Sequence, residues 1–231
     1  MTNKKTFFNW STGKDSAFAL YKLLKADQYH VGKLITSVNK DFERVTMHGL
    51  RLELLQRQLD QLNIPCDKIE LSEKTSMKEY EEMMRQKLES LKGEGYEYAA
   101  FGDIFLEDLK EYREKQLSSF GIKAVFPIWK ENTKELLRDF IQLGFKTIVV
   151  CINGSKLDKS FCGRVIDESF INDLPDDVDP CGENGEFHTF CFDGPIFNNP
   201  IPFQKGDLVK REYPDPENPE LKHPYWFCDL V

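Results

Sequence analysis

A short polar segment near the N-terminus has the residue types that bind phosphate. It reads Ser11-Thr12-Gly13-Lys14-Asp15-Ser16, and it joins an apolar run at 6–10 to a helical pattern at 16–26. Backbone N–H groups and the positive end of a helix attract anions at such a junction. Glycine permits close approach and unusual dihedral angles, lysine adds a positive charge, and serine hydroxyls donate hydrogen bonds. The first glycine of the G-x-x-x-x-G-K-[ST] loop is missing, so the segment predicts a phosphate loop of another kind.

A second polar segment far downstream combines acidic residues with a histidine. It runs Gly182-Glu183-Asn184-Gly185-Glu186-Phe187-His188-Thr189. Its glycines allow a tight turn, Glu183 and Glu186 can hold an ammonium-like group or Mg²⁺, and His188 can act as a general base. Alone, the segment is typical of a solvated acidic loop with a hydrogen-bonded histidine. Together with the phosphate loop, it predicts substrate recognition by Gly182, Glu183, Asn184, Gly185, Glu186 and Thr189, with Glu186 and His188 in catalysis.

The elements that must position these segments alternate between strand and helix. Apolar runs separated by helical periods predict a parallel sheet with helices on both faces. Ligands of such sheets bind beyond the carboxyl ends of the strands. The later runs lie at residues 33–38, 67–71, 98–102, 123–126 and 147–152.

Local signals mark several of the intervening helices. Leucines recur at steps of three and four over 49–63, which is typical of one helix face. Ser76 and Glu79 form the pattern of a capping box, and we expect a helix to begin there. Asn132 and Glu135 indicate another helix start.

Single residues near the predicted strand ends are weaker candidates. Asp103 follows the run at 98–102, where a metal or phosphate ligand is useful, and a cap for the next helix is an equal alternative. His48 can reach a phosphate or lie on the surface of a loop. Arg164 can bind a phosphate or carboxylate, and its alternative is a surface ion pair of little energetic value.

Composition limits the classes of function. The 231 residues include 31 basic and 39 acidic side chains, a net charge of −8, which disfavours a nucleic-acid-binding role. We expect a cytoplasmic protein that does not contact membrane, because no apolar run suits a signal peptide or a span. Six cysteines without a C-x-x-C pair argue against a disulfide scaffold. Zinc at Cys181, His188 and Cys191 is less favoured than ordinary thiols beside a histidine.

The pattern of predicted strands and helices along the chain indicates two units of unequal size. We place a domain that contains the phosphate loop at 1–127 and a smaller substrate-binding domain with a C-terminal tail at 128–231. Residues 153–200 are rich in Gly, Asp, Pro and Phe without a long period, which is typical of functional loops. The tail at 201–231 indicates an edge strand or a wrapping segment.

The phosphate loop resembles that of the PP-loop ATP pyrophosphatases, in the HUP-type adenine nucleotide α-hydrolase superfamily. The resemblance implies that Ser11–Ser16 hold the phosphates of ATP, and that ATP is cleaved between its α- and β-phosphates. Most members have two glycines here, whereas this chain has Thr12 at the first position. That departure places a tighter conformational demand on the loop.

The other motifs resemble the diphthine–ammonia ligase family over about residues 5–203. They are Met47-His48-Gly49, Gly102-Asp103-Ile104, Gly163-Arg164, the segment from Asp179-Pro180-Cys181 through Thr189, and Asp193-Gly194-Pro195. The resemblance implies a Rossmann-like α/β sheet of HUP type with a smaller C-terminal α+β substrate domain. It implies ATP and Mg²⁺ as cofactors. It assigns ATP binding to the phosphate loop with Thr36, Asn39, His48 and Gly102, substrate binding to Arg164, metal binding to Asp103, and catalysis to Lys14, Asp103, Glu186 and His188.

The implied reaction activates a carboxylate by adenylation, releases pyrophosphate, and forms an amide when ammonia attacks. In archaea and eukaryotes the implied acceptor is the modified histidine of translation elongation factor 2, and a bacterial relative needs another acceptor. A tRNA-modifying thiolase and a nucleotide-binding sensor without turnover are the alternatives. The acidic charge and the absence of C-x-x-C disfavour the thiolase. The sequence leaves a homodimer open.

Overall fold

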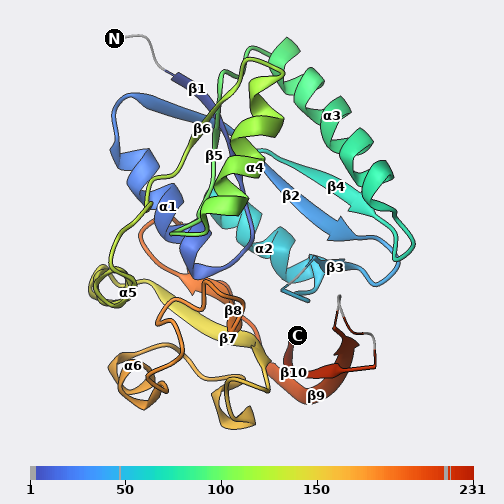
Figure 1. Cartoon of the computed structure of the whole chain (residues 1–231). Coiled ribbons are helices and arrows are strands. Elements are labelled where there is room, and N and C mark those ends of the chain that lie inside the picture. Colours follow the sequence, from blue (N-terminus) through green and yellow to red (C-terminus); the bar gives the residue numbers. More distant parts are fainter. Residues whose placement is uncertain (1–3, 47, 216–217, 219) are drawn as a thin grey trace.

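Two β-sheets organise the chain (Figure 1). The structure is a computed structural model, and it describes residues 4–46, 48–215, 218 and 220–231. The first sheet has parallel strands in the order β4-β2-β1-β5-β6, and a short strand, β3, pairs antiparallel with the end of β2. The bounds are β1 Lys4–Asn9, β2 Tyr29–Asn39, β3 Arg44–Val45, β4 Cys66–Leu71, β5 Tyr98–Ala100 and β6 Lys123–Val125.

Helices cover both faces of this sheet, because its central strand is apolar on both sides. Successive side chains of a strand point to opposite faces. Phe7 accordingly packs with Leu88 and Leu117, from the helices on one face, whereas Phe8 packs with Leu20 and Leu55, from those on the other. The helices are α1 Lys14–Lys25, α2 Leu52–Leu62, α3 Met77–Gly93 and α4 Glu107–Ser118. The predicted α/β class and Rossmann-like arrangement are confirmed.

Helix starts follow the local signals in the sequence. Ser76 and Glu79 exchange the reciprocal hydrogen bonds of a capping box at the start of α3. The side chain of Asn132 accepts hydrogen bonds from the backbone N–H groups of Lys134 and Glu135, at the start of α5. Both caps satisfy N–H groups that lack partners within the helix.

The second sheet is antiparallel, in the order β8-β7-β10-β9. It takes up the apolar run at 147–152, which the alternation had placed with the parallel strands. This strand pairs with β8 and β10, and those long-range partners were not visible in its own residues. The elements are α5 Thr133–Gln142, β7 Lys146–Asn153, the 3₁₀ turn η1 Lys159–Phe161, α6 Glu168–Asp173, β8 Phe187–Asp193, β9 Lys205–Pro214 and β10 Lys222–Leu230.

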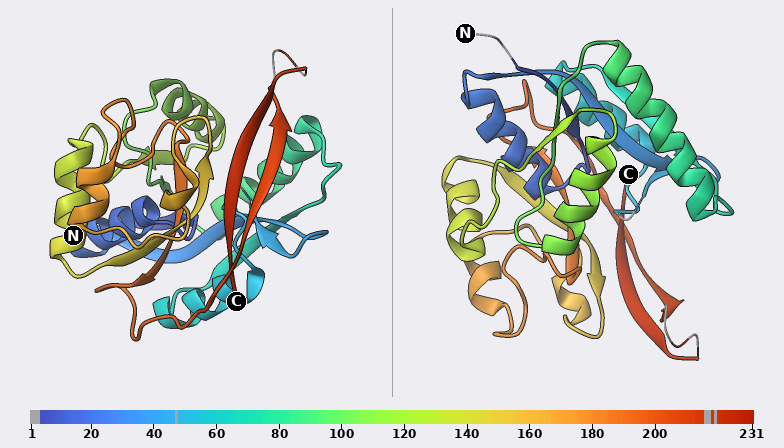
Figure 2. Two further views of the ribbon diagram at one scale, coloured as in Figure 1. Left: turned by 90° about the horizontal axis from the view of Figure 1, so that it is seen from below. Right: turned by 45° about the horizontal axis from the view of Figure 1, so that its top comes forward.

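One apolar core connects the two sheets. Residues of α1 and α2 share a buried cluster with α5, β7 and β8, so α1 and α2 lie between the first sheet and the second. The tail forms the β9–β10 hairpin, which projects from the rest of the molecule (Figure 2). Asp229 of β10 connects the base of this hairpin to β3 and to the start of α2, through ion pairs with Arg44 and Arg51 at 3.0 and 2.5 Å. Among the helices of the described residues, none has the length and apolar character needed to cross a bilayer.

Candidate functional site

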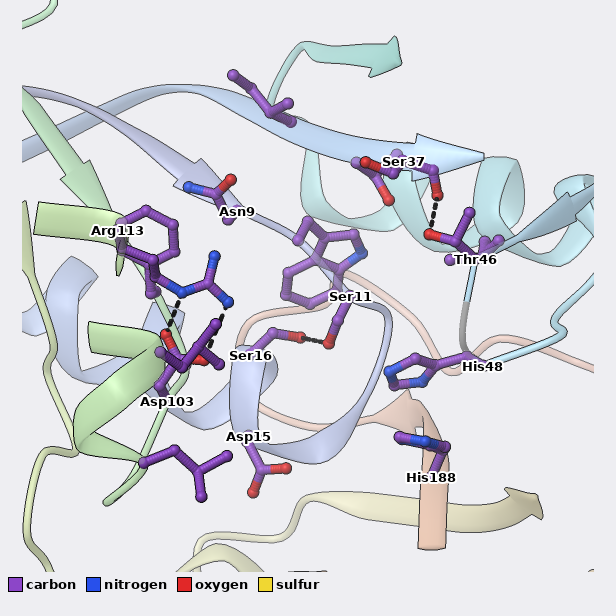
Figure 3. Close-up of a pocket in the computed structure, with 18 of the residues that line it drawn as sticks. Asn9, Ser11, Asp15, Ser16, Ser37, Thr46, His48, Asp103, Arg113 and His188 are labelled. Atoms are coloured by element: carbon purple, nitrogen blue, oxygen red, sulfur yellow. Dashed lines mark hydrogen bonds and ion pairs between the residues drawn. The ribbon is translucent and has the colours of Figure 1, made fainter. Parts of the chain in front are cut away.

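The predicted phosphate loop lies at the carboxyl end of β1 and leads into α1, with Gly13 as the N-cap residue. The hydroxyl of Ser11 donates to that of Ser16 at 3.0 Å, and the hydroxyl of Ser16 donates to the Gly13 carbonyl at 3.0 Å. Figure 3 shows the two serines side by side in the cavity. The loop therefore presents hydroxyl groups at the positive end of a helix, as an anion site requires.

Thr12, and not Gly13, has the unusual backbone conformation of the loop. Thr12 has a φ of +76°, which is costly for a β-branched residue, whereas Gly13 has a φ of −87°. Our expectation of unusual dihedral angles at Gly13 was therefore wrong. The glycine is required by close packing, since a Cβ atom there would lie 2.8 Å from His48 Cε1 and 3.2 Å from Thr189 Oγ1.

A buried amide holds the strained threonine in place. Gln58 is fully buried, and its Nε2 donates to the carbonyls of Thr12 and Cys191 at 3.1 and 2.7 Å. Its Oε1 accepts from Trp10 Nε1 at 2.8 Å. The backbone N–H of Cys191 also donates to the Thr12 carbonyl, at 3.0 Å. The loop conformation thus depends on α2 and β8, which lie far away in sequence.

Lys14 is the buried cation of the site. Its Nζ lies 2.7 Å from both carboxylate oxygens of Asp15, and it donates to the carbonyl of Cys181. Burial alone lowers the pKa of Lys14, but the adjacent Asp15 carboxylate raises it above the ordinary value. Lys14 therefore stays charged, and part of its charge is already neutralised before any ligand binds.

The second polar segment folds into a compact loop beside the phosphate loop. Asp179 accepts hydrogen bonds from the N–H groups of Cys181 and Glu183, at 3.0 and 3.1 Å. Gly182 has a φ of +70°, and a Cβ atom there would lie 2.9 Å from the ring of Phe187. Only glycine suits that position.

Glu186 stabilises this loop through hydrogen bonds and does not line the cavity. Its carboxylate is buried and accepts from the Asp179 N–H at 3.1 Å and from the Asn184 amide at 3.0 Å. The expectation of a catalytic Glu186 conflicts with this placement, because the carboxylate points into its own loop. Glu183 is the acidic residue of the pair that lines the cavity.

Two further hydrogen bonds join the phosphate loop region to β8, besides the one between the Cys191 N–H and the Thr12 carbonyl. The backbone N–H of Lys14 donates to Thr189 Oγ1 at 3.0 Å. His48 Nδ1 lies 2.9 Å from the Thr189 carbonyl, so Nδ1 carries the proton and Nε2 is left as an acceptor. The two motifs that the sequence places far apart therefore form one site.

The shared site is a cavity of about 840 Å³, large enough for a nucleotide-sized ligand. Among the predicted site residues it is lined by Ser11, Lys14, Asp15, Ser16, Thr36, His48, Gly102, Asp103, Gly182, Glu183, Asn184, Gly185, His188 and Thr189. Lining residues that sequence reasoning did not assign to the site include Asn9, Thr46, Tyr80, Met84, Phe101, Tyr112, Arg113 and Gln116. They carry no motif, so only their positions at strand ends or on α3 and α4 relate them to the site.

His48 and His188 lie next to each other in the cavity wall, with ring centroids 5.0 Å apart (Figure 3). Burial lowers the pKa of His48 to about 4 and that of His188 to about 3, and the Lys14 charge adds to both effects. Both rings are therefore neutral at pH 7. A ring of such low basicity is a weak general base, because proton transfer is most efficient when the pKa is near the working pH.

Glu183 has the proton affinity that the histidines lack. Burial raises the pKa of its carboxyl group to about 7, and nearby Asp15 and Asp103 contribute. The group is held in place by the backbone N–H of Ile104, which donates to Oε1 at 2.7 Å. A carboxyl group that titrates near pH 7 inside a cavity is suited to acid–base chemistry.

Asp103 forms an ion pair with Arg113 of α4. This pair and the two histidines lie on opposite sides of the loop serines (Figure 3). The distances are 2.7 Å from Nε to Oδ2 and 3.1 Å from Nη2 to Oδ1. Asp103 does not cap α4, whose N-cap residue is Leu106. Within the described part of the chain, no group of three or more His, Cys, Asp or Glu side chains is arranged to hold a metal ion.

Several predicted site residues lie outside the cavity lining. Asn39 accepts from the N–H groups of Asp41 and Phe42 in a turn. Arg164 forms a surface ion pair with Asp173 at 2.8 Å, which was the alternative to ligand binding in the sequence analysis. The structure therefore does not bring Asn39 to a nucleotide or Arg164 to a substrate in this cavity. The other predicted residues outside the lining are Thr12, Gly13 and Glu186, and Met47 lies outside the described residues.

Two family models match most of the chain, and one solved structure resembles part of it. The family model for the diphthamide synthase N-terminal domain matches residues 4–124, and that for the diphthamide synthase C-terminal domain matches residues 132–212. The U34-tRNA thiolase NcsA from Methanococcus maripaludis, solved with its [4Fe-4S] cluster, is 18% identical, with a TM-score of 0.37 over 62% of this chain and 58% of that chain.

Curated relatives match over part of their length. Diphthine–ammonia ligase from Homo sapiens is 26% identical over 110 residues, which are 45% of this chain and 41% of the relative. The enzyme of that name from Schizosaccharomyces pombe is 24% identical over 101 residues, 42% of this chain and 17% of the relative. The chain thus spans less than half of the length of these relatives. Because the N-terminal family model alone matches more than half of its residues, this chain belongs to the diphthamide synthase family.

Proposed function

We propose that the chain is an ATP-dependent ligase that forms an amide from a carboxylate and ammonia, as the names of its diphthine–ammonia ligase relatives suggest. The observation that carries the proposal is the Lys14–Thr189 hydrogen bond, at 3.0 Å. It joins the phosphate loop, at a helix start, to β8, the strand that directly follows the acidic loop, in one cavity. A nucleotide and a second reactant can therefore meet there.

ATP is expected to lie with its phosphates on the loop and its adenosine toward the end of β2. Ser11, Lys14 and Ser16 line the cavity at the start of α1, where hydroxyl donors, a cation and the helix dipole act together. Thr36 is the β2 residue at the adenosine side. Thr12 and Gly13 shape this loop and present no side-chain donor to the cavity.

Mg²⁺ fits the site only as an ion shared with the phosphates. This ion usually keeps several waters and takes one or two carboxylates together with substrate phosphates. Asp15 and Asp103 line the cavity, but each already pairs with a cation, Lys14 or Arg113. Bound there, Mg²⁺ would neutralise charge on the phosphates.

The proposed chemistry has two steps. A carboxylate oxygen of the acceptor attacks the α-phosphorus of ATP, the bond to the bridging oxygen breaks, and pyrophosphate leaves. Ammonia then attacks the acyl carbon, the acyl–oxygen bond breaks, and AMP leaves with loss of one proton. We assign uptake of that proton to Glu183, whose pKa near 7 suits it. Neutral His188 is left to orient a reactant through hydrogen bonds.

The diphthine of translation elongation factor 2 is the proposed acceptor where the source organism makes diphthamide. Elsewhere the same chemistry requires another carboxylate. A thiolase that relies on a reactive cysteine is less favoured. Among the described residues no cysteine lines the cavity, and burial raises the pKa of all six thiols, which keeps them protonated and unreactive.

The test is chromatography of the nucleotide products after incubation with ATP, ammonium and the acceptor. AMP and pyrophosphate are expected, and ADP as the main product would refute the reaction class. Lys14→Ala should weaken ATP binding by roughly 1–3 kcal/mol. Lys25→Ala, an exposed lysine of the same helix, is the matched control and should bind ATP as the wild type does. ATP binding without any turnover would indicate a nucleotide sensor.

A further inference from the structure

A second full positive charge lies in the cavity, apart from the phosphate loop. Arg113 comes from α4, and its guanidinium carbon lies 4.3 Å from the centre of the Phe101 ring. Figure 3 shows the Asp103–Arg113 pair on one side of the loop serines and the two histidines on the other. Arg113 thus adds a cation on the side of the loop serines that faces away from the histidines.

The ion pair with Asp103 leaves Arg113 with unused donors. Nε and Nη2 face the carboxylate, and among the described residues Nη1 donates to no partner. Nε of Arg113 and Oδ2 of Asp103 are buried, and their contact is too poorly directed to count as a hydrogen bond. A guanidinium has five donors in a planar fork, so it can bind a second carboxylate while it keeps the first.

The α4 side of the cavity is mostly apolar. The ring of Phe101 contacts the guanidinium, and Leu106, Leu109 and Tyr112 also line the cavity from the start and the body of α4, with Gln116 as a polar neighbour. A triphosphate gains nothing from such a wall, and its charges already have Lys14, the loop hydroxyls and the helix start. A carboxylate attached to an apolar or aromatic body satisfies both the cation and the wall.

We propose that Arg113 binds the carboxylate of the acceptor and that the α4 wall holds the apolar part next to it. The inference rests on the proposed function, which requires a carboxylate substrate in this cavity. Phe101 fixes the plane of the guanidinium, and Asp103 fixes its direction. Arg113 is therefore a substrate-binding residue on the acceptor side of the site.

The test compares a simple carboxylate with its neutral isostere by calorimetry, without turnover. The probes are 3-phenylpropionate and 3-phenylpropanamide, titrated into the whole chain. The wild type should bind the carboxylate about tenfold more tightly, the scale of one charge-assisted hydrogen bond. Arg113→Gln should remove this preference, and Arg113→Lys should retain part of it, because lysine keeps the charge and loses the fork.

Arg85→Gln is the matched control, since Arg85 is an exposed arginine of α3 that pairs with Glu82 and Glu89. It should retain the full preference, and all variants should bind ATP within about twofold of the wild type. Equal binding of the two probes to the wild type, or no binding of either, would overturn the proposal. So would a tenfold loss of ATP affinity in Arg113→Gln with the carboxylate preference intact. If ADP is the main product but the Arg113-dependent preference persists, the reaction class fails and the carboxylate site stands.

Discussion

The backbone N–H of Lys14 donates a hydrogen bond of 3.0 Å to the hydroxyl oxygen of Thr189. Lys14 begins α1, after the first strand of the parallel sheet, and Thr189 belongs to β8 of the antiparallel sheet. An N–H group in the first turn of a helix has no partner within that helix. Thr189 supplies the partner, so the anion site depends on the contact between the two sheets.

Thr189→Val should weaken both folding and nucleotide binding. Valine keeps the shape of threonine but leaves the Lys14 N–H without an acceptor in a buried place. The free energy of unfolding should fall by about 1–2 kcal/mol, as measured by urea denaturation, and calorimetry should show lower ATP affinity. Thr189→Ser keeps the hydroxyl and should bind ATP nearly as the wild type does. Equal ATP affinity of the valine and serine variants would show that this bond does not set the loop.

Gln58→Leu should destabilise the chain strongly. The change leaves the buried indole N–H of Trp10 without an acceptor and removes two donors from the carbonyls of Thr12 and Cys191. We expect the free energy of unfolding to fall by about 2–4 kcal/mol. Gln56→Leu, two residues closer to the helix start and exposed, should change the free energy of unfolding by less than about 0.5 kcal/mol. Similar losses in the two variants would contradict the role of the buried amide.

Gly102→Ala should weaken ATP binding, whereas Gly93→Ala should stabilise the chain. A Cβ atom at Gly102 would lie 2.9 Å from the backbone nitrogen of Ser16 and 3.0 Å from its Cα, so the start of α1 must move and ATP affinity must fall. At Gly93, in α3, a Cβ atom meets nothing within 4 Å. Alanine there should stabilise the helix by about 0.5–1 kcal/mol. Thermal unfolding and ATP titration of both variants provide the check, and an unchanged ATP affinity in Gly102→Ala would contradict the close approach of β5 to α1.

Glu183→Gln should change how stability depends on pH. The pKa of Glu183 is about 7 in the folded chain and 4.5 ordinarily, so between these values the folded chain binds more protons than the unfolded chain. This group's contribution to stability is therefore full below pH 4.5 and is lost as the pH rises through 7. Glutamine can still accept from the Ile104 N–H and carries no charge.

As the pH rises from 4 to 8, the free energy of unfolding of the Glu183→Gln variant should increase by about 1–3 kcal/mol relative to that of the wild type. His48 and His188, whose pKa values are lowered, act in the opposite sense, but their effect is common to both proteins and cancels in the difference. Urea denaturation of both proteins from pH 4 to pH 8 measures this difference in the free energy of unfolding. A difference that does not vary with pH would show that Glu183 titrates at its ordinary pKa.

Much of the fold was visible in the sequence because its signals are local. Ser76 and Glu79 lie within one helical turn, so their capping box follows from the residues alone. The family assignment was equally accessible, since it rests on motifs that are continuous in sequence. The antiparallel pairing of β7 was not, because an apolar β-branched strand is compatible with either sheet and its partners β8 and β10 come later in the chain.

The sequence by itself determined the residue types of the site: a strand–loop–helix junction with Gly13 and Lys14, and an acidic segment framed by glycines. The tertiary structure decided which side chains face the cavity. Glu183 faces it and Glu186 does not, although both lie in the same short loop, because Glu186 is held by the backbone of Asp179. It also placed the left-handed conformation at Thr12 and brought Arg113 beside Asp103. These outcomes depend on contacts between segments far apart in the chain, whose energies no short stretch of sequence contains.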